Sequence, residues 1–518
     1  MAFPKISRLT DVNQLAAHNK NNDCIILVTS QKNCTTSPLI DEAISKALTI
    51  DQRIGEQPVL IHAPELAGGR LIHSTSGPID RDYDDVRNFG DAAAKGIILA
   101  RDAGAKNPII LVEGVPAREA FANACEVSYL GACQALWQPL EAREFLGENE
   151  VETIESITLV DVNDQINLDF LSAVEAGKRL ARDLAGTEPE RFAPAGFAEY
   201  CQQAMTGTSV AVEIIDDRAT IEKEFPLLGA VARASQAVTR HQPRVVHMDY
   251  VGEGPIEKTL ILVGKAVTYD TGGADVKIGG HMAGMSRDKG GAAAVAGFMK
   301  TLAELKPKGL KVRATLGVVR NSIGPDSYVA DEIILAHSGV RVRIGNTDAE
   351  GRLVMADLLS HGREMAKNET APELMTIATL TGHASLAAGP YTILIENGPA
   401  RDQQMADKLE QAGESWGDCI EIGRSRREDW KMIQPRSKAD DVLSSNNGPS
   451  VSVARGHQFP MAFLALSSGL DKHGSQSEQP IAYTHIDIAG SGVEGSDWQH
   501  GKPTAAPVAA LAARYLLG

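Results

Sequence analysis

Acidic residues and lysines crowd against glycines in three short segments, 265–277, 285–291 and 346–353. These segments supply four carboxylates that could converge: Asp270, Asp288, Asp348 and Glu350. Carboxylates brought together without counter-charges repel one another and raise each other's pKa. Two divalent cations about 3.5–4 Å apart would remove this repulsion. We therefore expect a two-metal site with oxygen ligands, which suit hard or borderline metals.

The neighbouring sequence would place these carboxylates at strand ends and helix starts. Asp270 ends an apolar predicted strand and is followed by Thr-Gly-Gly; ligands bind at the carboxyl ends of strands in open α/β sheets. Asp288 and Asp348 each lie just before a predicted helix, over 289–305 and 350–367. Taken singly, each could also be an ordinary helix cap, stabilised by exposed amides and the helix dipole. The joint pattern favours the metal site.

Two lysines and one arginine accompany the carboxylates. A dication beside Lys265 or Lys277 would lower the lysine pKa, so that the neutral amine could coordinate metal. A lysine that stays charged could instead bind a carbonyl oxygen or its tetrahedral oxyanion. Arg352, two residues after Glu350, offers a fixed planar cation for an anion in the same site.

The octapeptide Asn-Thr-Asp-Ala-Glu-Gly-Arg-Leu at 346–353 resembles the signature of the leucyl aminopeptidases, the cytosolic M17 metallopeptidase family. Ala378–Gly382 and His485–Gly490 resemble further motifs of that family. The resemblance extends from about Leu180 to the C-terminus. Before that point only the α/β pattern and a connecting helix agree.

The spacing of the charged residues also resembles that of the family. Lys265 precedes Asp270 by five residues, and Lys277 and Asp288 follow Asp270 by seven and 18. The resemblance implies that two metals are bound by Lys265, Asp270, Asp288, Asp348 and Glu350. Asp270 and Glu350 would bridge the two metals.

The resemblance implies catalytic and binding roles as well. Lys277 would polarise the scissile carbonyl, and Arg352 would hold a bicarbonate ion that acts as general base for a metal-bridging water. The substrate would be oriented, and its first side chain enclosed, by Met285, Thr379, Leu380, Thr381 and Gly382.

The expected activity is removal of an N-terminal residue, leucine or another apolar residue, from peptides with a free N-terminus. The resemblance implies zinc as the usual metal, with manganese, magnesium or cobalt as substitutes, and a homohexameric assembly. Two alternatives stay open: a weakly active scaffold or binding protein with this fold, and a two-metal hydrolase of non-peptide amides.

Several positions near the expected site depart from the family pattern. Arg320-Asn321 replaces a Glu-Asn pair, Val329-Ala330-Asp331 replaces Pro-Gly-Asp, and Asp275-Val276 precedes Lys277 where Ser-Ile or Ser-Leu is usual. Met282–Gly291 is also an uncommon form. Because the ligands are spared, these departures concern substrate preference and indicate a divergent, acidic subgroup.

Three other polar residues lie near these motifs. His281 falls between Lys277 and Asp288 and could reach the site, although a structural role is the stronger interpretation. His485 and Asp487 lie on an apolar predicted strand and are interpreted as structural.

Apolar runs alternate with helical patterns along the chain, which predicts an α/β fold. We expect two domains: a smaller macro-like α/β domain over 1–166 and a catalytic domain over 187–518. The catalytic domain should contain a central mixed sheet flanked by helices. A connecting helix over 167–186, followed by a Pro- and Gly-rich loop, would join them.

Composition narrows the class of protein. The 518 residues are 43% hydrophobic and carry a formal charge of −16, which argues against binding a nucleic-acid backbone. No apolar run approaches the roughly 20 residues that span a bilayer, and no secretory signal is visible. The six cysteines lack a Cys-x-x-Cys pair, which is typical of reduced thiols. We expect a cytoplasmic protein that binds neither membranes nor nucleic acid.

Overall fold

The computed structural model describes residues 3–446, 448 and 450–517, and the chain divides into two compact units. Unit 1 comprises Met1–Ala176 and Gln411–Asp418, and unit 2 comprises Gly177–Glu410 and Cys419–Gly518. The helices α6 (Leu168–Gly186) and α14 (Met405–Ser415) each contain residues of both units. The domain limits expected from the sequence stay a prediction, and the sequence gives no sign that residues 411–418 group with unit 1.

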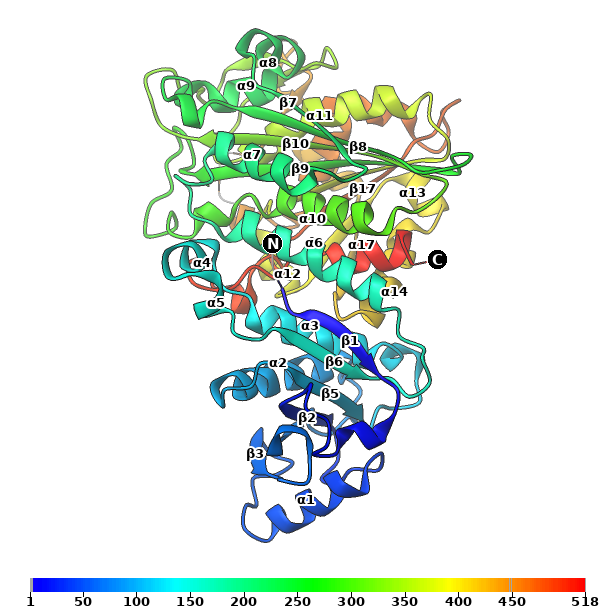
Figure 1. Cartoon of the computed structure of the whole chain (residues 1–518). Coiled ribbons are helices and arrows are strands. Elements are labelled where there is room, and N and C mark those ends of the chain that lie inside the picture. The colour runs from blue at the N-terminus through cyan, green and yellow to red at the C-terminus, as the bar shows by residue number, and fades with distance from the viewer. Residues whose placement is uncertain (1–2, 447, 449, 518) are drawn as a thin grey trace. The chain divides into compact units, whose positions relative to one another are not determined.

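Unit 1 contains a six-stranded sheet in the order β1-β6-β5-β2-β4-β3, blue to cyan in Figure 1. All neighbouring strands are parallel except β3 and β4. All of β2 is buried, because α1 packs on the side of Ile25 and α2 on the side of Ile26. The elements are β1 (Lys5–Leu9), β2 (Cys24–Thr29), α1 (Pro38–Leu48), β3 (Val59–His62), β4 (Arg70–Thr75), α2 (Arg87–Asp102), β5 (Pro108–Glu113), α3 (Ala124–Leu136), α4 (Leu140–Leu146), α5 (Glu148–Val151) and β6 (Ser156–Val160).

Unit 2 is built on an eight-stranded mixed sheet in the order β15-β14-β17-β13-β9-β10-β8-β7. β9 runs parallel to both β10 and β13, whereas β8 is antiparallel to β10. The strands are β7 (Ala211–Ile215), β8 (Arg244–Val251), β9 (Lys258–Asp270), β10 (Leu310–Asn321), β13 (Pro372–Ala378), β14 (Thr392–Glu396), β15 (Ile420–Arg424) and β17 (Ala482–Asp487). A smaller sheet contains β11 (Ile333–Leu335), β12 (Arg341–Arg343) and β16 (Val442–Leu443).

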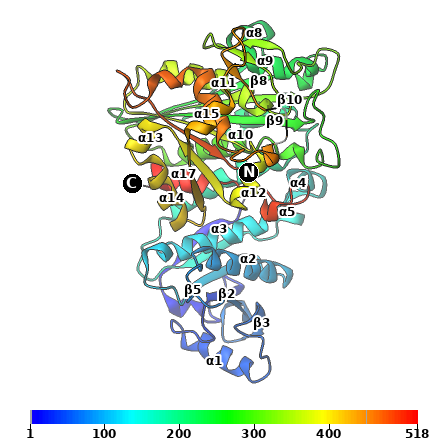
Figure 2. The same ribbon diagram turned by 180° about the vertical axis from the view of Figure 1, so that it is seen from behind.

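Helices cover both faces of the large sheet (Figures 1 and 2). Besides the parts of α6 and α14 that belong to it, unit 2 contains the helices α7 (Pro194–Met205), α8 (Arg218–Glu224), α9 (Pro226–Ala232), α10 (Gly290–Leu305), α11 (Glu350–Ala366), α12 (Gly382–Ala388), α13 (Gly398–Asp402), α15 (Arg427–Met432), α16 (Phe459–Ser468) and α17 (Val508–Tyr515). The predicted α/β class, with a central mixed sheet flanked by helices, is confirmed. None of the helices within the described ranges is long and apolar enough to cross a membrane.

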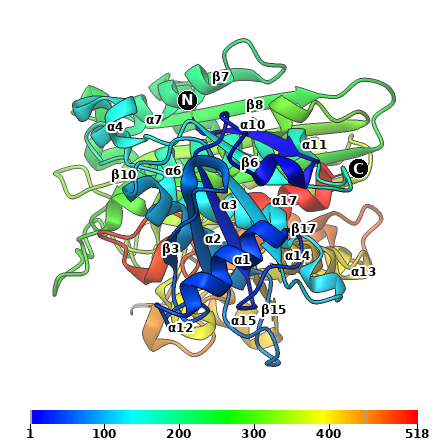
Figure 3. The same ribbon diagram turned by 60° about the horizontal axis from the view of Figure 1, so that its bottom comes forward.

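The residues of β9 alternate between two helices. β9, β10 and β8 lie side by side in that order, and β8 and β10 are labelled in Figure 3. A Cβ added at Gly264 of β9 would lie 2.6 Å from the Cα of Ala292 in α10, so glycine permits this close approach. On the other face, a Cβ at Gly362 of α11 would contact Ile261 of β9 at 3.0 Å. Lys265, in step with Ile261, therefore lies on the α11 side.

Candidate active site

The predicted site residues lie at one edge of the large sheet. β9 ends at Asp270, and its parallel neighbour β10 ends at Asn321. β13, parallel to β9 on the other side, ends one residue before Thr379. Because parallel strands bring their carboxyl ends to the same edge, residues far apart in the sequence meet there.

A cavity of about 300 Å³ opens at this edge. Every residue assigned a site role by the sequence analysis lines it: Lys265, Asp270, Lys277, Met285, Asp288, Asp348, Glu350, Arg352, Thr379, Leu380, Thr381 and Gly382. The structure therefore brings the whole predicted set together, whereas the individual roles stay predictions.

Three carboxylates form the buried centre of this cavity. One oxygen from each of Asp270, Asp288 and Glu350 lies within 4.8 Å of the others, and each residue is at most 5% exposed. Asp288 Oδ2 and Glu350 Oε2 are buried and have no hydrogen-bond partner among the residues that the structure describes. A buried polar atom without a partner costs roughly 1–3 kcal/mol, and more when it is charged. These oxygens are therefore placed to bind a cation.

Lys265 reaches into the centre from β9. Its Nζ lies 2.6 Å from Asp288 Oδ1 and 3.0 Å from Glu350 Oε1, and it donates to the carbonyl oxygen of Thr379 at 2.9 Å. A Cβ at Gly351 would lie 2.6 Å from Lys265 Cε. Glycine at this position is what lets the lysine pass beneath the first turn of α11.

Lys277 enters the cavity from the loop that follows β9. Its Nζ lies 2.9 Å from Asp270 Oδ2 and 2.5 Å from Asp348 Oδ1. Its backbone N–H donates to the carbonyl oxygen of Thr271 at 2.9 Å, which ties this part of the loop to the strand end. The ammonium group thus joins two of the four predicted carboxylate ligands.

The charges at the centre do not cancel. Four carboxylates and two lysines leave a formal charge of −2. Burial, with Asp270 nearby, raises the pKa of Asp348 to about 7, and the same two causes raise the pKa of Glu350. Burial raises the pKa of Asp288 well above its ordinary value. For Lys265, burial favours the neutral amine, but the carboxylates led by Asp288 outweigh it and raise the pKa. The site is short of positive charge, and a dication would supply it.

The alternative interpretation of these carboxylates as helix caps is wrong for Asp288. The residue that caps α10 is Lys289, and the Asp288 carboxylate accepts hydrogen bonds from Lys265 and Thr379 instead. The N-cap of α11 is Ala349, which makes no side-chain capping bond.

Polar contacts lock the loops of the site together. Asn321 Nδ2 donates to Asp270 Oδ1 at 2.8 Å and to the carbonyl oxygen of Thr347 at 3.1 Å. The Asp275 carboxylate accepts from the Thr347 N–H at 2.7 Å, and the Asp275 N–H donates to Thr347 Oγ1 at 2.8 Å. Asp275, one of the departures from the family pattern, thus fastens the loop of Lys277 to the loop of Asp348.

The segment that follows β13 is held by Asp487. Its carboxylate accepts from the Leu380 N–H at 3.1 Å and from Thr381 Oγ1 at 2.7 Å. Thr379 Oγ1 in turn donates to Asp288 Oδ1 at 2.8 Å. This arrangement gives Asp487 a positioning role next to the cavity.

His485 lies on the same strand, fully buried, with Nδ1 2.8 Å from Thr376 Oγ1. Burial, helped by the charge of Arg352, lowers the pKa of His485 to about 3. It therefore remains neutral at physiological pH, in keeping with a structural role. His281 is exposed and lines the cavity.

Arg352 forms a fixed cation in the cavity wall. Its Nη1 donates to the carbonyl oxygen of Ser444 at 2.9 Å, and its guanidinium carbon lies 4.9 Å from the centre of the Phe459 ring. Burial lowers the pKa of Arg352 to about 10, so the group is still charged at pH 7. A buried guanidinium held in this way can bind an anion that enters the cavity.

Part of the cavity lining is apolar. Met285 and Leu380, both predicted, line it together with Val451, Ala489 and Trp498, which the sequence analysis missed. Trp498 lies in a loop near the C-terminus, where no motif or hydrophobic period marks it. The cavity thus combines an ionic centre with a wall suited to an apolar side chain.

Comparison with known proteins gives this arrangement its family. Residues 179–512 match the family model described as the cytosol aminopeptidase family, catalytic domain. The chain belongs to this family, M17. A Caenorhabditis elegans protein named for a proposed aminopeptidase activity is 39% identical over 94% of this chain and 93% of its own length. A "Probable cytosol aminopeptidase" of Roseiflexus castenholzii is 30% identical over 76% of this chain and 74% of its own.

Two solved structures share the fold with this M17 member. The apo leucyl aminopeptidase of Trypanosoma cruzi superposes with a TM-score of 0.77 and 22% identity, covering 99% of this chain and 97% of that one. The bottromycin maturation enzyme BotP in complex with Mn superposes with a TM-score of 0.73 and 22% identity, covering 95% and 98%. As a member of M17, the chain is a metal-dependent aminopeptidase and therefore a hydrolase.

The residues present fit the metal requirement of an M17 aminopeptidase. Asp270, Asp288 and Glu350 offer buried oxygens within reach of one cation, and two of these oxygens have no hydrogen-bond partner among the described residues. Carboxylate oxygens suit magnesium and manganese, and zinc accepts them too. Coordination by Lys265, whose Nζ pairs with Asp288 and Glu350, would require its neutral amine form.

Proposed function

We propose that this aminopeptidase holds two divalent cations with Lys265, Asp270, Asp288, Asp348 and Glu350 and removes leucine or other apolar residues from the N-terminus of peptides. The proposal rests on a group of buried carboxylates whose negative charge is not fully balanced by the two lysines, in a cavity that also has apolar lining residues. When bound, such a metal pair polarises a carbonyl and lowers the pKa of water. Zinc is our first choice, with manganese, magnesium or cobalt as alternatives.

We propose that Lys277 stabilises charge that develops on the substrate. Its ammonium group has three N–H donors, and two face Asp270 and Asp348. The third can donate to the scissile carbonyl oxygen, and this bond strengthens as the oxygen becomes a tetrahedral oxyanion. We assign Lys277 this electrophilic role.

We propose that Arg352 holds an anion beside the reacting carbonyl. A bicarbonate ion bound there would act as general base, taking a proton from the attacking water. The buried guanidinium of Arg352, fixed by Ser444 and Phe459, provides the positive charge for this ion without a change of conformation.

The apolar wall accounts for the proposed preference. A leucine side chain that packs against Met285, Leu380 and Trp498 would gain about 1.5–3 kcal/mol from burial. The carboxylate-rich centre favours the positively charged or metal-coordinating N-terminal amine, which makes the enzyme an exopeptidase.

We further propose, on the family resemblance, that the chain forms homohexamers and acts in the cytoplasm on peptides, without membranes or nucleic acid as partners.

A panel of aminoacyl amides tests this function. The metal-loaded protein should hydrolyse leucyl amide faster than glutamyl amide, should not hydrolyse N-acetyl-leucyl amide, and should lose all activity with a chelator. Equal hydrolysis of the acetylated substrate would instead indicate a hydrolase of non-peptide amides. No hydrolysis of any substrate by the metal-loaded protein would indicate a scaffold or binding protein.

A further inference from the structure

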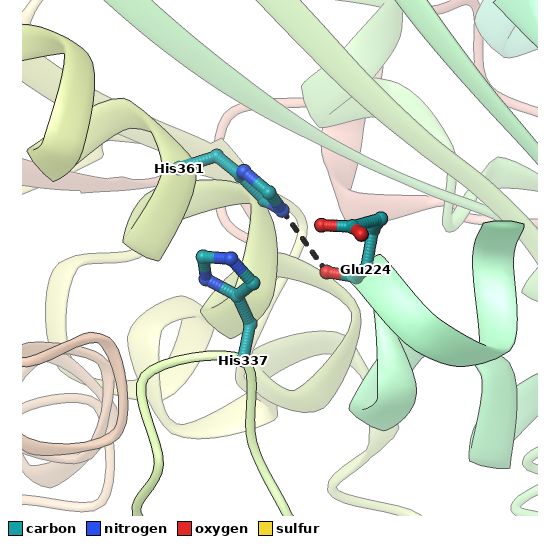
Figure 4. A group of neighbouring side chains, drawn as sticks. All are labelled: Glu224, His337 and His361. Atoms are coloured by element: carbon teal, nitrogen blue, oxygen red, sulfur yellow. Dashed lines mark hydrogen bonds between the residues drawn. The ribbon is translucent and has the colours of Figure 1, made fainter.

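Two histidines and a glutamate meet in unit 2 on side chains that the catalytic centre does not use (Figure 4). We propose that Glu224, His337 and His361 form a separate binding site for one zinc-type divalent cation. One potential ligand atom from each residue lies within 4.8 Å of the others. The three come from the end of α8, the loop between β11 and β12, and α11.

The potential ligand atoms of the three residues lie close together. Figure 4 shows the two imidazole rings and the Glu224 side chain turned toward one another. His361 Nε2 also lies 3.0 Å from the backbone carbonyl oxygen of Glu224, the last residue of α8. This carbonyl has no partner within the helix and accepts a hydrogen bond from the Nε2–H of His361. When a cation displaces that proton, the carbonyl oxygen becomes available as a fourth, oxygen ligand. Two imidazoles, one carboxylate and one further oxygen make a set that zinc accepts in tetrahedral sites.

Neighbouring groups prepare the histidines for this role. His337 Nδ1 lies 3.0 Å from Ser360 Oγ, which leaves Nε2 for a metal, and the His337 backbone N–H donates to Asp357 Oδ1 at 2.9 Å. Such secondary contacts orient metal-binding histidines. The rings of His337 and His361 stack with their centres 3.7 Å apart and their planes at 27°. To direct both nitrogen lone pairs at one ion, the rings must splay by side-chain rotation, which their partial exposure permits.

The site has an entry route and lies apart from the catalytic centre. Glu224 and His361 line a cavity of about 290 Å³ that also contains His247 and Thr315. His361 follows Glu350 by 11 residues on α11, which is about 16 Å along a helix. Among the described residues the Glu224 carboxylate forms an ion pair with exposed Lys223 at 2.7 Å, which is of the weak surface kind. A cation bound here would tie α8, the β11–β12 loop and α11 together and so serve as a structural clamp.

Zinc titration of the full-length protein tests the proposal. Chelator-treated protein is titrated with Zn²⁺, and bound zinc per chain is counted by elemental analysis after gel filtration. The variant with His337→Ala and His361→Ala together should bind one zinc fewer than wild type. The control His247→Ala, a histidine of the same cavity outside the set, should match wild type. An unchanged zinc count in the double variant overturns the proposal.

Two milder variants keep the proposal testable if the double variant does not fold. Glu224→Gln and Ser360→Ala should each weaken zinc binding at this site at least tenfold, measured by competition with a chromophoric chelator. Each change is made in an Asp288→Ala background, which removes a ligand of the proposed catalytic metals and weakens zinc binding there, so that the measured affinity reports the clamp. Unchanged affinity in both milder variants would overturn the proposal whatever the fate of the proposed catalytic metals.

Discussion

Replacing Lys277 by methionine should separate catalysis from metal binding. Methionine has a similar length but no charge, so the variant loses an ammonium that lies 2.9 Å from Asp270 Oδ2 and 2.5 Å from Asp348 Oδ1. The formal charge of the centre falls from −2 to −3. Two unit charges about 4 Å apart interact by about 4 kcal/mol at an effective dielectric constant of about 20. A dication should therefore bind the variant at least as tightly as it binds wild type.

Catalysis should change in the opposite direction. Removing one positioned donor to an oxyanion typically lowers kcat by about 10²–10³, or about 2.7–4 kcal/mol. We expect a loss of this size for leucyl p-nitroanilide, with KM little changed, in steady-state assays paired with elemental analysis. Lys300→Met, which removes a lysine paired with Glu304 on α10, is the matched control and should keep wild-type kinetics. A kcat within fivefold of wild type, or metal lost together with activity, would refute the reasoning.

Three further predictions concern pH, specificity and the anion. Burial raises the pKa of Asp357 to about 7. Between pH values of about 4, the pKa in the unfolded chain, and about 7, the folded protein keeps a proton that the unfolded chain releases. The free energy of unfolding therefore falls as pH rises, by up to about 1.4 kcal/mol per pH unit. Between pH 5 and 7 the free energy of unfolding of chelated protein, measured with denaturant, should therefore fall less steeply with rising pH in Asp357→Asn than in wild type. Equal slopes would contradict this. Trp498→Ala should raise the ratio of kcat/KM for phenylalanyl over leucyl amide, because it widens the apolar wall; an unchanged ratio would exclude Trp498 from the specificity pocket. Arg352→Ala should abolish stimulation by bicarbonate in carbonate-free buffer and lower kcat by roughly 10²–10⁴, and a variant with the wild-type bicarbonate response would remove Arg352 from this role.

The ionic part of the site could be predicted from the sequence because its residues lie in compact motifs at element ends. Asp270 closes an apolar strand, which the rule for parallel sheets places at the carboxyl edge, and Asp348 and Glu350 lie in a signature octapeptide at the start of a helix. The whole set of predicted residues lines the same cavity for this reason. The central sheet and its flanking helices followed from the alternation of apolar and amphipathic runs.

Features that depend on tertiary contacts between distant, irregular segments could not be predicted. Trp498 reaches the cavity from a loop whose path no local pattern defines. The contact between Asp275 and Thr347 joins loops 72 residues apart, and the sequence marked Asp275 only as a departure from a family pattern. His337 and His361 carry no metal-ligand spacing, because their meeting depends on how the β11–β12 loop packs on α11.

The central claim is that two divalent cations at the sheet edge are required for peptide hydrolysis. Its most direct test counts metal and activity in the same samples. Chelated protein carrying His337→Ala and His361→Ala, which removes the proposed clamp, is titrated with Mn²⁺ while bound metal and leucyl amide hydrolysis are both measured. We predict no activity without metal and full activity at two bound ions per chain. Full activity with one bound ion, or any turnover in metal-free protein, would contradict the two-metal account.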